Sequence, residues 1–364
     1  RKTGMETMNE QRMRIAISGL HRGENPQPGA GIVRSLRRRF PDAFIVGLVY
    51  DAMESGIYVV GGPDVVYAMP YPTAGADVYL QRLDEILART PFDFFLPTLD
   101  AEIELLAYLE SGFASRGLTT CLPEVESLHR RSKNHLSALA EECDVEVPET
   151  EAIYDLSGAR RAIGRLGYPC MVKGQYYDAR RVVNDIELAS AVNKLLGEWG
   201  APAILQRCIN GPEFNAMGIG DGEGGIIGLC CIRKTILSDK GKGCGAITIR
   251  DEKLERLCQR LISALQWRGP FEIEVMMDEE IGDYSLIEIN PRFPAWVDFP
   301  SQFGVNFPAA LIEMMSGGKT PAALPVCQPG HFYVRHQIEV LGHVDQLAEL
   351  ATSVDFSALP VHTV

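Results

Sequence analysis

Two segments near residue 280 carry acidic and amide side chains that could hold a metal ion. Residues 271–275 (Phe-Glu-Ile-Glu-Val) and 286–290 (Leu-Ile-Glu-Ile-Asn) alternate apolar and polar residues, which predicts two β-strands. Successive side chains of a strand point to opposite faces, so Glu288 and Asn290 share one face. If the two strands pair as a hairpin, their oxygen-bearing side chains converge. Carboxylate and amide oxygens are hard ligands that suit Mg²⁺, so we predict a metal site here that includes Glu274.

Two interpretations of this pattern remain open. Glu272 competes with Glu274 for the first ligand position, because both side chains lie on the same face of the same strand. A solvated polar face of an amphipathic sheet would give the same alternation. Spacing alone does not separate these alternatives.

Basic residues at several places could bind phosphate. Lys173 ends an apolar strand, where a half-buried ammonium group needs an anionic partner. Lys133 lies near the middle of a helix predicted over residues 123–143. Arg233 precedes the Gly-rich stretch 239–245, whose lysines and open backbone amides could hold an anion. Taken singly, each lysine is better explained as a surface residue, and a surface loop explains the Gly-rich stretch equally.

A third pattern is the segment 206–213, Gln-Arg-Cys-Ile-Asn-Gly-Pro-Glu. An apolar strand runs here into a Gly-Pro turn that ends in a carboxylate. The backbone could pair with the edge of a base, and Glu213 could accept hydrogen bonds from ribose hydroxyls. Asn-Gly-Pro is also an ordinary turn sequence, so the segment alone is a weak indication.

The type of β-sheet predicted for the elements that position these residues changes along the chain. Short apolar strands near residues 14–20, 43–50, 64–67 and 92–97 alternate with helical segments, which predicts a parallel, helix-covered sheet. Strands joined by Gly-rich turns follow over 214–250, which predicts an antiparallel sheet. Further helices are predicted at 29–39, 78–89, 101–111, 156–166, 185–198, 254–266 and 308–315.

Composition excludes several functional classes. The 364 residues suffice for two or three domains, and the net charge of −13 argues against general binding to nucleic acid or anionic membranes. No apolar stretch approaches the length of a membrane span. The nine cysteines include no CxxC pair, which favours free thiols and a cytoplasmic location. Neither a P-loop motif nor a complete GxGxxG fingerprint is present, which weakens the alternative of a Rossmann dehydrogenase.

The order of these motifs resembles the ATP-grasp superfamily. Lys133, Lys173 after a Tyr-Pro step, the segment 206–213, Glu274 and the phrase Glu288-Ile-Asn-Pro-Arg292 follow one another as in that superfamily. The branch is that of the ATP-binding domain of the carbamoyl-phosphate synthase large chain and related carboxylate–amine ligases. The similarity extends over residues 14–320, and its most specific part is the Glu-Ile-Asn-Pro-Arg phrase with the Gly-Pro-Phe-Glu-Ile-Glu sequence before it.

The resemblance implies roles for individual residues. The residues implied for nucleotide binding are two lysines, a hinge segment and a ribose-binding carboxylate: Lys133, Lys173, Gln206, Cys208, Ile209 and Glu213. Metal binding falls to Glu274, Glu288 and Asn290. Glu274 is preferred over Glu272 because its counterpart lies two residues after the first polar position of the strand. Arg292 corresponds to the basic residue near the transferred phosphate, and Arg233 is expected to assist it.

The resemblance also implies an activity, cofactors and partners. We expect ATP with Mg²⁺, which Mn²⁺ could replace, and ligation of a small-molecule carboxylate to an amine through an acyl phosphate. Carbamoyl-phosphate-synthase-like or carboxylase-type phosphoryl transfer is the alternative, and a catalytically weak nucleotide-binding module is a third. No nucleic acid or membrane partner is expected, and a homodimer is compatible with the chain. One departure from the family is the segment Gly174–Arg180 after the second lysine, which has a single glycine where the family has a Gly-rich loop.

The expected fold is α/β and α+β. It consists of an N-terminal Rossmann-like parallel-sheet domain, a small lid and an antiparallel-sheet C-terminal domain. The predicted boundaries are a disordered start or appended remnant at 1–13, a first domain at 14–120, a linker helix and lid at 121–205, a catalytic subdomain at 206–330 and a tail at 331–364.

Overall fold

The computed structural model describes residues 12–23, 25–174, 179–238, 243–317, 324–352 and 356–357. The departure at Gly174–Arg180 falls largely on residues 175–178, outside the described residues. Lys240 and Lys242 of the Gly-rich stretch also lie outside them, as do residues 1–11.

The first body is built on a parallel sheet in which β1 lies between β2 and β4. Its strands are short and buried because helices cover the sheet, as the continuous apolar runs predict. Its elements are β1 (Arg14–Ser18), α1 (Gly29–Arg39), β2 (Phe44–Val49), η1 (Ser55–Ile57), β3 (Val65–Ala68), η2 (Pro72–Ala74), α2 (Ala76–Arg89), β4 (Phe94–Leu96), α3 (Asp100–Tyr108) and α4 (Glu110–Ala114).

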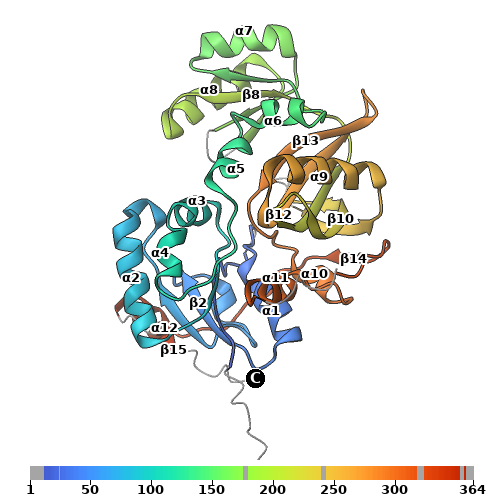
Figure 1. The fold of residues 1–364 in the computed structure, drawn as a ribbon. Helices are drawn as coiled ribbons and strands as arrows, with labels where there is room; N and C mark the ends of the chain where they lie inside the picture. The colour runs from blue at the N-terminus through green and yellow to red at the C-terminus, as the bar shows by residue number, and fades with distance from the viewer. Residues whose placement is uncertain are drawn as a thin grey trace, which may run out of the picture.

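Two short helices, α5 (Val125–Arg130) and α6 (Leu136–Glu142), connect this body to the next (Figure 1). The prediction of one helix over 123–143 is therefore wrong, and Lys133 lies in the turn between the two helices. The side chain of Ser132 hydrogen-bonds His135 across this turn. Short polar side chains compete with helical backbone bonds in this way. The buried Arg131 also anchors the turn by donating to the carbonyl of Ile289.

The lid is a four-stranded antiparallel sheet with the strand order β5-β8-β6-β7. Two helices cover it, and each begins at a capping side chain, Asp155 for α7 and Asn184 for α8. Its apolar core contains only residues between 153 and 205, so the lid has a core of its own. Its elements are β5 (Thr150–Ile153), α7 (Leu156–Leu166), β6 (Cys170–Lys173), β7 (Ala179–Val182), α8 (Asp185–Trp199) and β8 (Ala203–Arg207).

The third body is a six-stranded sheet with the order β13-β12-β9-β10-β11-β14, antiparallel throughout. One face packs on α9, which Asp251 caps. The other face turns toward α11 and carries the polar residues considered below. Its elements are β9 (Glu213–Asp221), β10 (Ile226–Leu237), β11 (Gly243–Ile249), α9 (Glu252–Leu265), β12 (Arg268–Asp278), β13 (Asp283–Asn290), α10 (Asp298–Ser301), α11 (Phe307–Met315) and β14 (Phe332–Val334).

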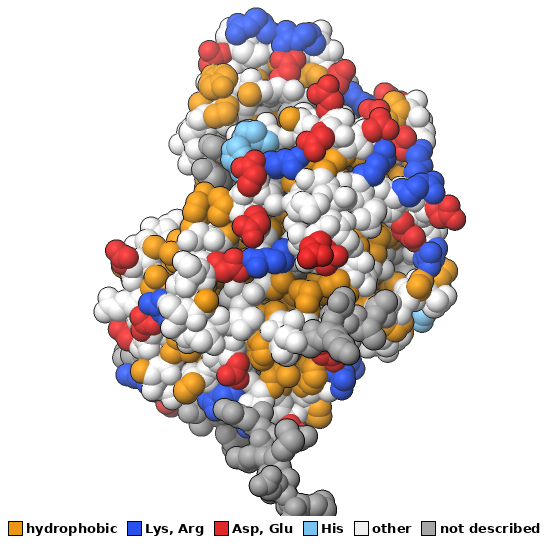
Figure 2. Space-filling view, viewed as in Figure 1, with side chains coloured by type: hydrophobic (Ala, Val, Ile, Leu, Met, Phe, Trp, Pro, Cys, Tyr) orange, Lys and Arg blue, Asp and Glu red, His pale blue; other side chains and the backbone are white. Residues whose placement is uncertain are grey.

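The last part of the chain returns to the first body. Helix α12 (Val344–Thr352) and the short strand β15 (Phe356–Ser357) lie beside it, and β15 pairs antiparallel with β3 (Figure 1). The structure therefore confirms the predicted architecture of a parallel first sheet, a lid and an antiparallel third sheet. In Figure 2 the left edge of the molecule is indented between the lid and the first body, and acidic and basic side chains are interspersed on the face shown. None of the described helices is both long and apolar enough to span a membrane.

Candidate active site

The two predicted acidic strands do form an antiparallel hairpin. Glu272 lies opposite Asn290 and Glu274 lies opposite Glu288, so all four side chains share one face of the third sheet. Ile273 and Ile289, which alternate with them, are fully buried on the face that packs on α9. The hairpin therefore brings together the three predicted metal ligands and their competitor, Glu272.

Lys234 on β10 completes this cluster. Its Nζ donates to Glu213 Oε2 at 2.8 Å and to Glu274 Oε2 at 3.2 Å. Burial alone would lower the pKa of Lys234, but Glu274 and Glu213 raise it above its usual value. The lysine is thus held as a cation between two carboxylates.

Arg233 lies away from this cluster. Adjacent residues of a strand point to opposite faces, and the side chain of Arg233 is exposed while that of Lys234 is largely buried. The structure therefore corrects the expectation for Arg233 and brings Lys234 to the carboxylates instead. Residues 230–232 of β10 are buried on both faces of the strand. The sequence pattern therefore does not show which of the two basic residues faces the site.

The donor set fits a divalent cation. Burial and the neighbouring Glu274 raise the pKa of Glu288, and Lys133 lowers it in part. Such repulsion between carboxylates is relieved when a cation binds between them. Asn290 donates through Nδ2 to Glu272 and Glu274, both at 3.1 Å, which leaves its amide oxygen as the atom suited to a metal. Within the described residues no group of three or more His, Cys, Asp or Glu side chains is arranged to hold a metal. A site of two carboxylates and one amide suits Mg²⁺, which usually keeps several waters.

Arg292 links this face to the first body. Its Nε donates to Asp100 Oδ1 at 3.2 Å and its Nη1 donates to Glu272 Oε2 at 3.3 Å. Asp100 begins α3 and also faces Arg131 at 3.5 Å. Burial would lower the pKa of Arg292, but Asp100 and Glu272 raise it. The arginine is therefore fixed at the junction of the first and third bodies.

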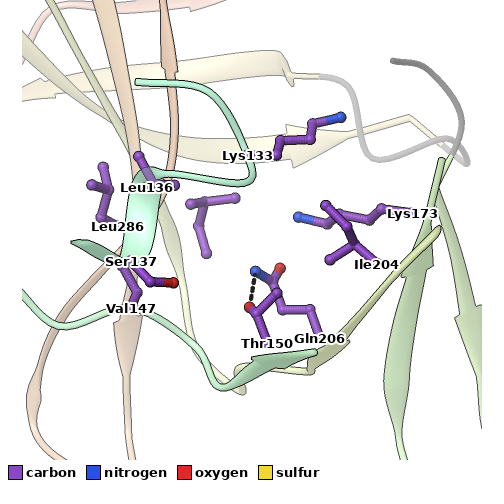
Figure 3. A pocket seen from close by; sticks show the side chains of 10 residues that line it. Lys133, Leu136, Ser137, Val147, Thr150, Lys173, Ile204, Gln206 and Leu286 are labelled. Carbon is purple, nitrogen blue, oxygen red and sulfur yellow. Dashed lines mark hydrogen bonds between the residues drawn. The ribbon is translucent and has the colours of Figure 1, made fainter. Parts of the chain in front are cut away.

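A partly apolar pocket lies between the lid and the hairpin (Figure 3). Lys173 reaches into it from the lid, Lys133 approaches from the turn after α5, and Gln206 donates to Thr150 Oγ1 at 3.1 Å. The remaining lining residues are mostly aliphatic: Leu136, Ser137, Val147, Ile204, Leu286 and Ile287. A pocket with aliphatic walls and two lysines has room for an apolar ring beside anionic groups.

Lys173 connects the pocket to the carboxylate face. Burial lowers its pKa, Glu288 raises it, and Lys133 lowers it further. These influences indicate that Lys173, Lys133 and Glu288 lie near one another. An anion held between the two lysines would reduce their mutual repulsion.

The other predicted nucleotide contacts lie farther from the pocket. Cys208 and Ile209 follow β8 and are partly buried, but the lining residue is Ile204. Arg181 hydrogen-bonds Cys208, and burial raises the pKa of that thiol. Glu213 begins β9 and is bound by Lys234.

Several site residues escaped the sequence reasoning. Asn215 on β9 donates to Glu272 at 2.6 Å, and Asp100 and Arg131 hold Arg292 and the end of β13. These contacts join segments more than 50 residues apart, and in general no local sequence pattern predicts them. Asn215 is the exception, because it lies two residues after Glu213 on the same strand face.

Comparison with known proteins finds an ATP-grasp domain in the chain. Residues 138–295 match a family model described as an ATP-grasp domain. The chain is 24% identical over 296 residues to a D-alanine--D-alanine ligase of Thermoanaerobacter, covering 74% of each chain. Its fold is similar to an L-amino acid ligase from Bacillus licheniformis, with a TM-score of 0.63, 16% identity and coverage of 89% and 79% of the two chains. It is also similar to the biotin carboxylase domain of Hydrogenobacter thermophilus 2-oxoglutarate carboxylase, with a TM-score of 0.66, 17% identity and coverage of 88% and 74%.

Residues 138–295 therefore carry an ATP-grasp domain, and the fold of the chain is similar to that of the L-amino acid ligase and of the biotin carboxylase domain. Members of this family use ATP with Mg²⁺ and act on small molecules, and the carboxylase domain above was solved as a dimer with MgADP and bicarbonate. At this level the protein is an ATP-dependent ligase or carboxylase.

Proposed function

We propose that this protein is a carboxylate–amine ligase that consumes ATP and releases ADP and phosphate. The observation that carries the proposal is the adjacency of two features. The pocket with Lys133 and Lys173 opens beside a sheet face with two opposed carboxylates, Glu274 and Glu288. The first could hold a nucleotide and the second its metal.

The proposed reaction has two steps. The substrate carboxylate attacks the γ-phosphorus of ATP, and the bond from that phosphorus to the β–γ bridging oxygen breaks, which gives an acyl phosphate and ADP. An amine then attacks the acyl carbon, phosphate leaves and the amine loses a proton, which gives an amide. Neither step requires a nucleophilic side chain, so positioning and charge neutralisation provide the catalysis.

The proposed roles follow the placement of the residues. Lys133, Lys173 and Gln206 bind the nucleotide, and Glu213 accepts from the ribose after exchange with Lys234. Glu274, Glu288 and Asn290 would hold Mg²⁺, which when bound neutralises phosphate charge. Arg292 and Lys234 neutralise the transferred phosphoryl group. Cys208 and Ile209 remain proposed hinge contacts.

Carboxylase-type transfer is the second candidate, because the biotin carboxylase domain is among the similar folds. In that reaction bicarbonate takes the place of the carboxylate substrate. A mixture of amino acids and other small acids, incubated with the protein, ATP, Mg²⁺ and hydroxylamine, separates the candidates. The ligase should give acid-dependent ADP and a hydroxamate from the trapped acyl phosphate.

Three outcomes would contradict the ligase proposal. ADP release that depends only on bicarbonate would favour the carboxylase. AMP and pyrophosphate as products would exclude an acyl phosphate. ATP binding without turnover, with every acid tested, would favour a nucleotide-binding module.

A further inference from the structure

Glu272 is a buried carboxylate to which four side chains donate. Asn215 Nδ2 and Trp296 Nε1 donate to Oε1 at 2.6 Å and 3.1 Å. Asn290 Nδ2 and Arg292 Nη1 donate to Oε2 at 3.1 Å and 3.3 Å. Glu272 itself is only 4% exposed. Each oxygen thus accepts from two donors.

Only a carboxylate satisfies this arrangement. A glutamine at this position would aim its NH₂ group at two of the four donors and leave them unpaired. Glu272 also differs from the proposed metal ligand Glu274 in burial, because the side chain of Glu274 is 27% exposed. Its opposite residue is Asn290, whereas Glu274 faces Glu288.

The four donors include residues of two regions, the proposed metal site and the segment that follows β13. Asn290 belongs to the proposed metal site and also donates to Glu274. Trp296 lies in the segment between β13 and α10, and α10 packs on α1 of the first body. Arg292 contacts Asp100, at the start of α3. Glu272 is therefore the shared acceptor between the proposed metal site and the buried segment of residues 293–298.

We propose that Glu272 is a positioning residue that couples nucleotide binding to the position of Trp296 and Arg292. The inference rests on the proposed function. A metal-bound nucleotide that draws the amide of Asn290 toward the cation changes one of the four hydrogen bonds of Glu272. The remaining three donors, Trp296 and Arg292 among them, adjust to the same carboxylate. By linkage, a change in the position of Trp296 and Arg292 then alters the affinity for the nucleotide in return.

The test uses protein labelled with 5-fluorotryptophan, in which the Trp296 resonance is assigned through Trp296→Phe. The chain has three tryptophans, so the ¹⁹F spectrum stays simple. A non-hydrolysable ATP analogue with Mg²⁺ is titrated into the wild type and into Glu272→Gln. We expect the Trp296 resonance to shift with saturation in the wild type. In Glu272→Gln the analogue should bind with a Kd within threefold of the wild type, but the shift should be lost.

Asp278→Asn is the matched control. Asp278 is a fully buried carboxylate six positions further along the same strand, where Arg207 binds it at 2.6 Å. This variant should keep the Trp296 shift, because the described partners of Asp278 include Arg207 and Glu280 and no residue of the segment 293–298. If Glu272→Gln fails to fold, Glu272→Asp, which keeps the charge, replaces it and should give a reduced shift.

The outcomes are distinguishable. Failure of the wild type to bind the analogue would overturn the proposed function itself. Binding without any change at Trp296 would overturn the coupling and leave the proposed function intact. A full shift in Glu272→Gln would show that the coupling does not run through Glu272.

Discussion

At the scale of single residues, the site depends on which face of a strand each side chain occupies. Lys234 is bound between Glu213 and Glu274, while its neighbour Arg233 is exposed on the other face. The two residues carry the same charge and differ by one position. They therefore form a natural pair for separating a local electrostatic role from a general effect of charge.

Lys234→Ala should lower kcat/KM by roughly 100-fold, the usual loss when one charged group facing the transferred phosphate is removed. The released Glu213 and Glu274 would also repel each other. Arg233→Ala should stay within about twofold of the wild type, since exposed charges contribute little. Steady-state kinetics of ADP release measure both. Equal losses in the two variants would contradict the assignment of Lys234.

Lys173 provides a prediction about nucleotide affinity. Lys173→Met keeps the length of the side chain and removes the charge, so the KM for ATP should rise about tenfold or more, as expected for a lost hydrogen bond to a charged group. Lys194→Met, on the exposed side of lid helix α8, is the control and should leave the KM unchanged. An unchanged KM in Lys173→Met would remove this lysine from the nucleotide site.

At the scale of elements, buried polar contacts tie the strands of the first sheet to α3. Glu102 on α3 is fully buried and accepts from Ser18 of β1 at 2.6 Å and from Tyr50, which follows β2. Burial raises the pKa of Glu102, although the hydrogen bond from Ser18 lowers it in part. The position of α3 matters for the site because Asp100, at its first residue, holds Arg292.

This pKa shift predicts a pH dependence of stability. A carboxyl group with a raised folded-state pKa favours folding below its unfolded-state pKa, about 4.3, and this contribution is lost as the pH rises through the folded-state value. Glu102→Gln cannot titrate, so the free energy of unfolding of the wild type minus that of the variant should fall as the pH increases above about 4.3. Urea denaturation at several pH values measures this difference.

Asp77→Asn, which removes an exposed carboxylate on α2, is the control for a general effect of net charge on stability. Parallel pH profiles for the wild type and Glu102→Gln would mean that Glu102 has an ordinary pKa in the folded protein.

Elements also show what the sequence could predict and what it could not. The pairing of Glu274 with Glu288 was predictable, because alternation along a strand is a local property and a short turn joins the two strands. The break between α5 and α6 was not, because Arg131 makes its decisive contact with Ile289, far along the chain. The choice of Lys234 over Arg233 also required the structure, because neighbouring strands and helices, and not the local pattern, determine which face is covered.

At the scale of the whole molecule, the chain forms three bodies, and the proposed site lies where they meet. Lys173 and Gln206 come from the lid, Glu274 and Glu288 from the third sheet, and Asp100 from the first body. Arg34 on α1 also binds Asp298 on α10 at 3.0 Å, which joins the first and third bodies at the end of the segment 293–298. The lid differs from the other two because its apolar core is separate.

A fragment of residues 146–209 should therefore fold alone. We expect a cooperative thermal transition by circular dichroism, and Leu195→Ala, which truncates a fully buried side chain, should lower its midpoint by several degrees. Glu198→Ala on the exposed side of α8 is the control. A fragment without a transition would mean that the lid needs the other bodies to fold.

The way the chain enters and leaves the lid has one more consequence. Its first and last strands, β5 and β8, are paired neighbours, with Thr150 opposite Gln206 and Ile153 opposite Ala203. The ends of the insertion thus meet at one place, as in domains that tolerate transplantation. We therefore expect the lid to be exchangeable. A lid from an ATP-grasp protein, spliced between residues 149 and 208, would test which half of the proposed nucleotide pocket sets the preference for the base.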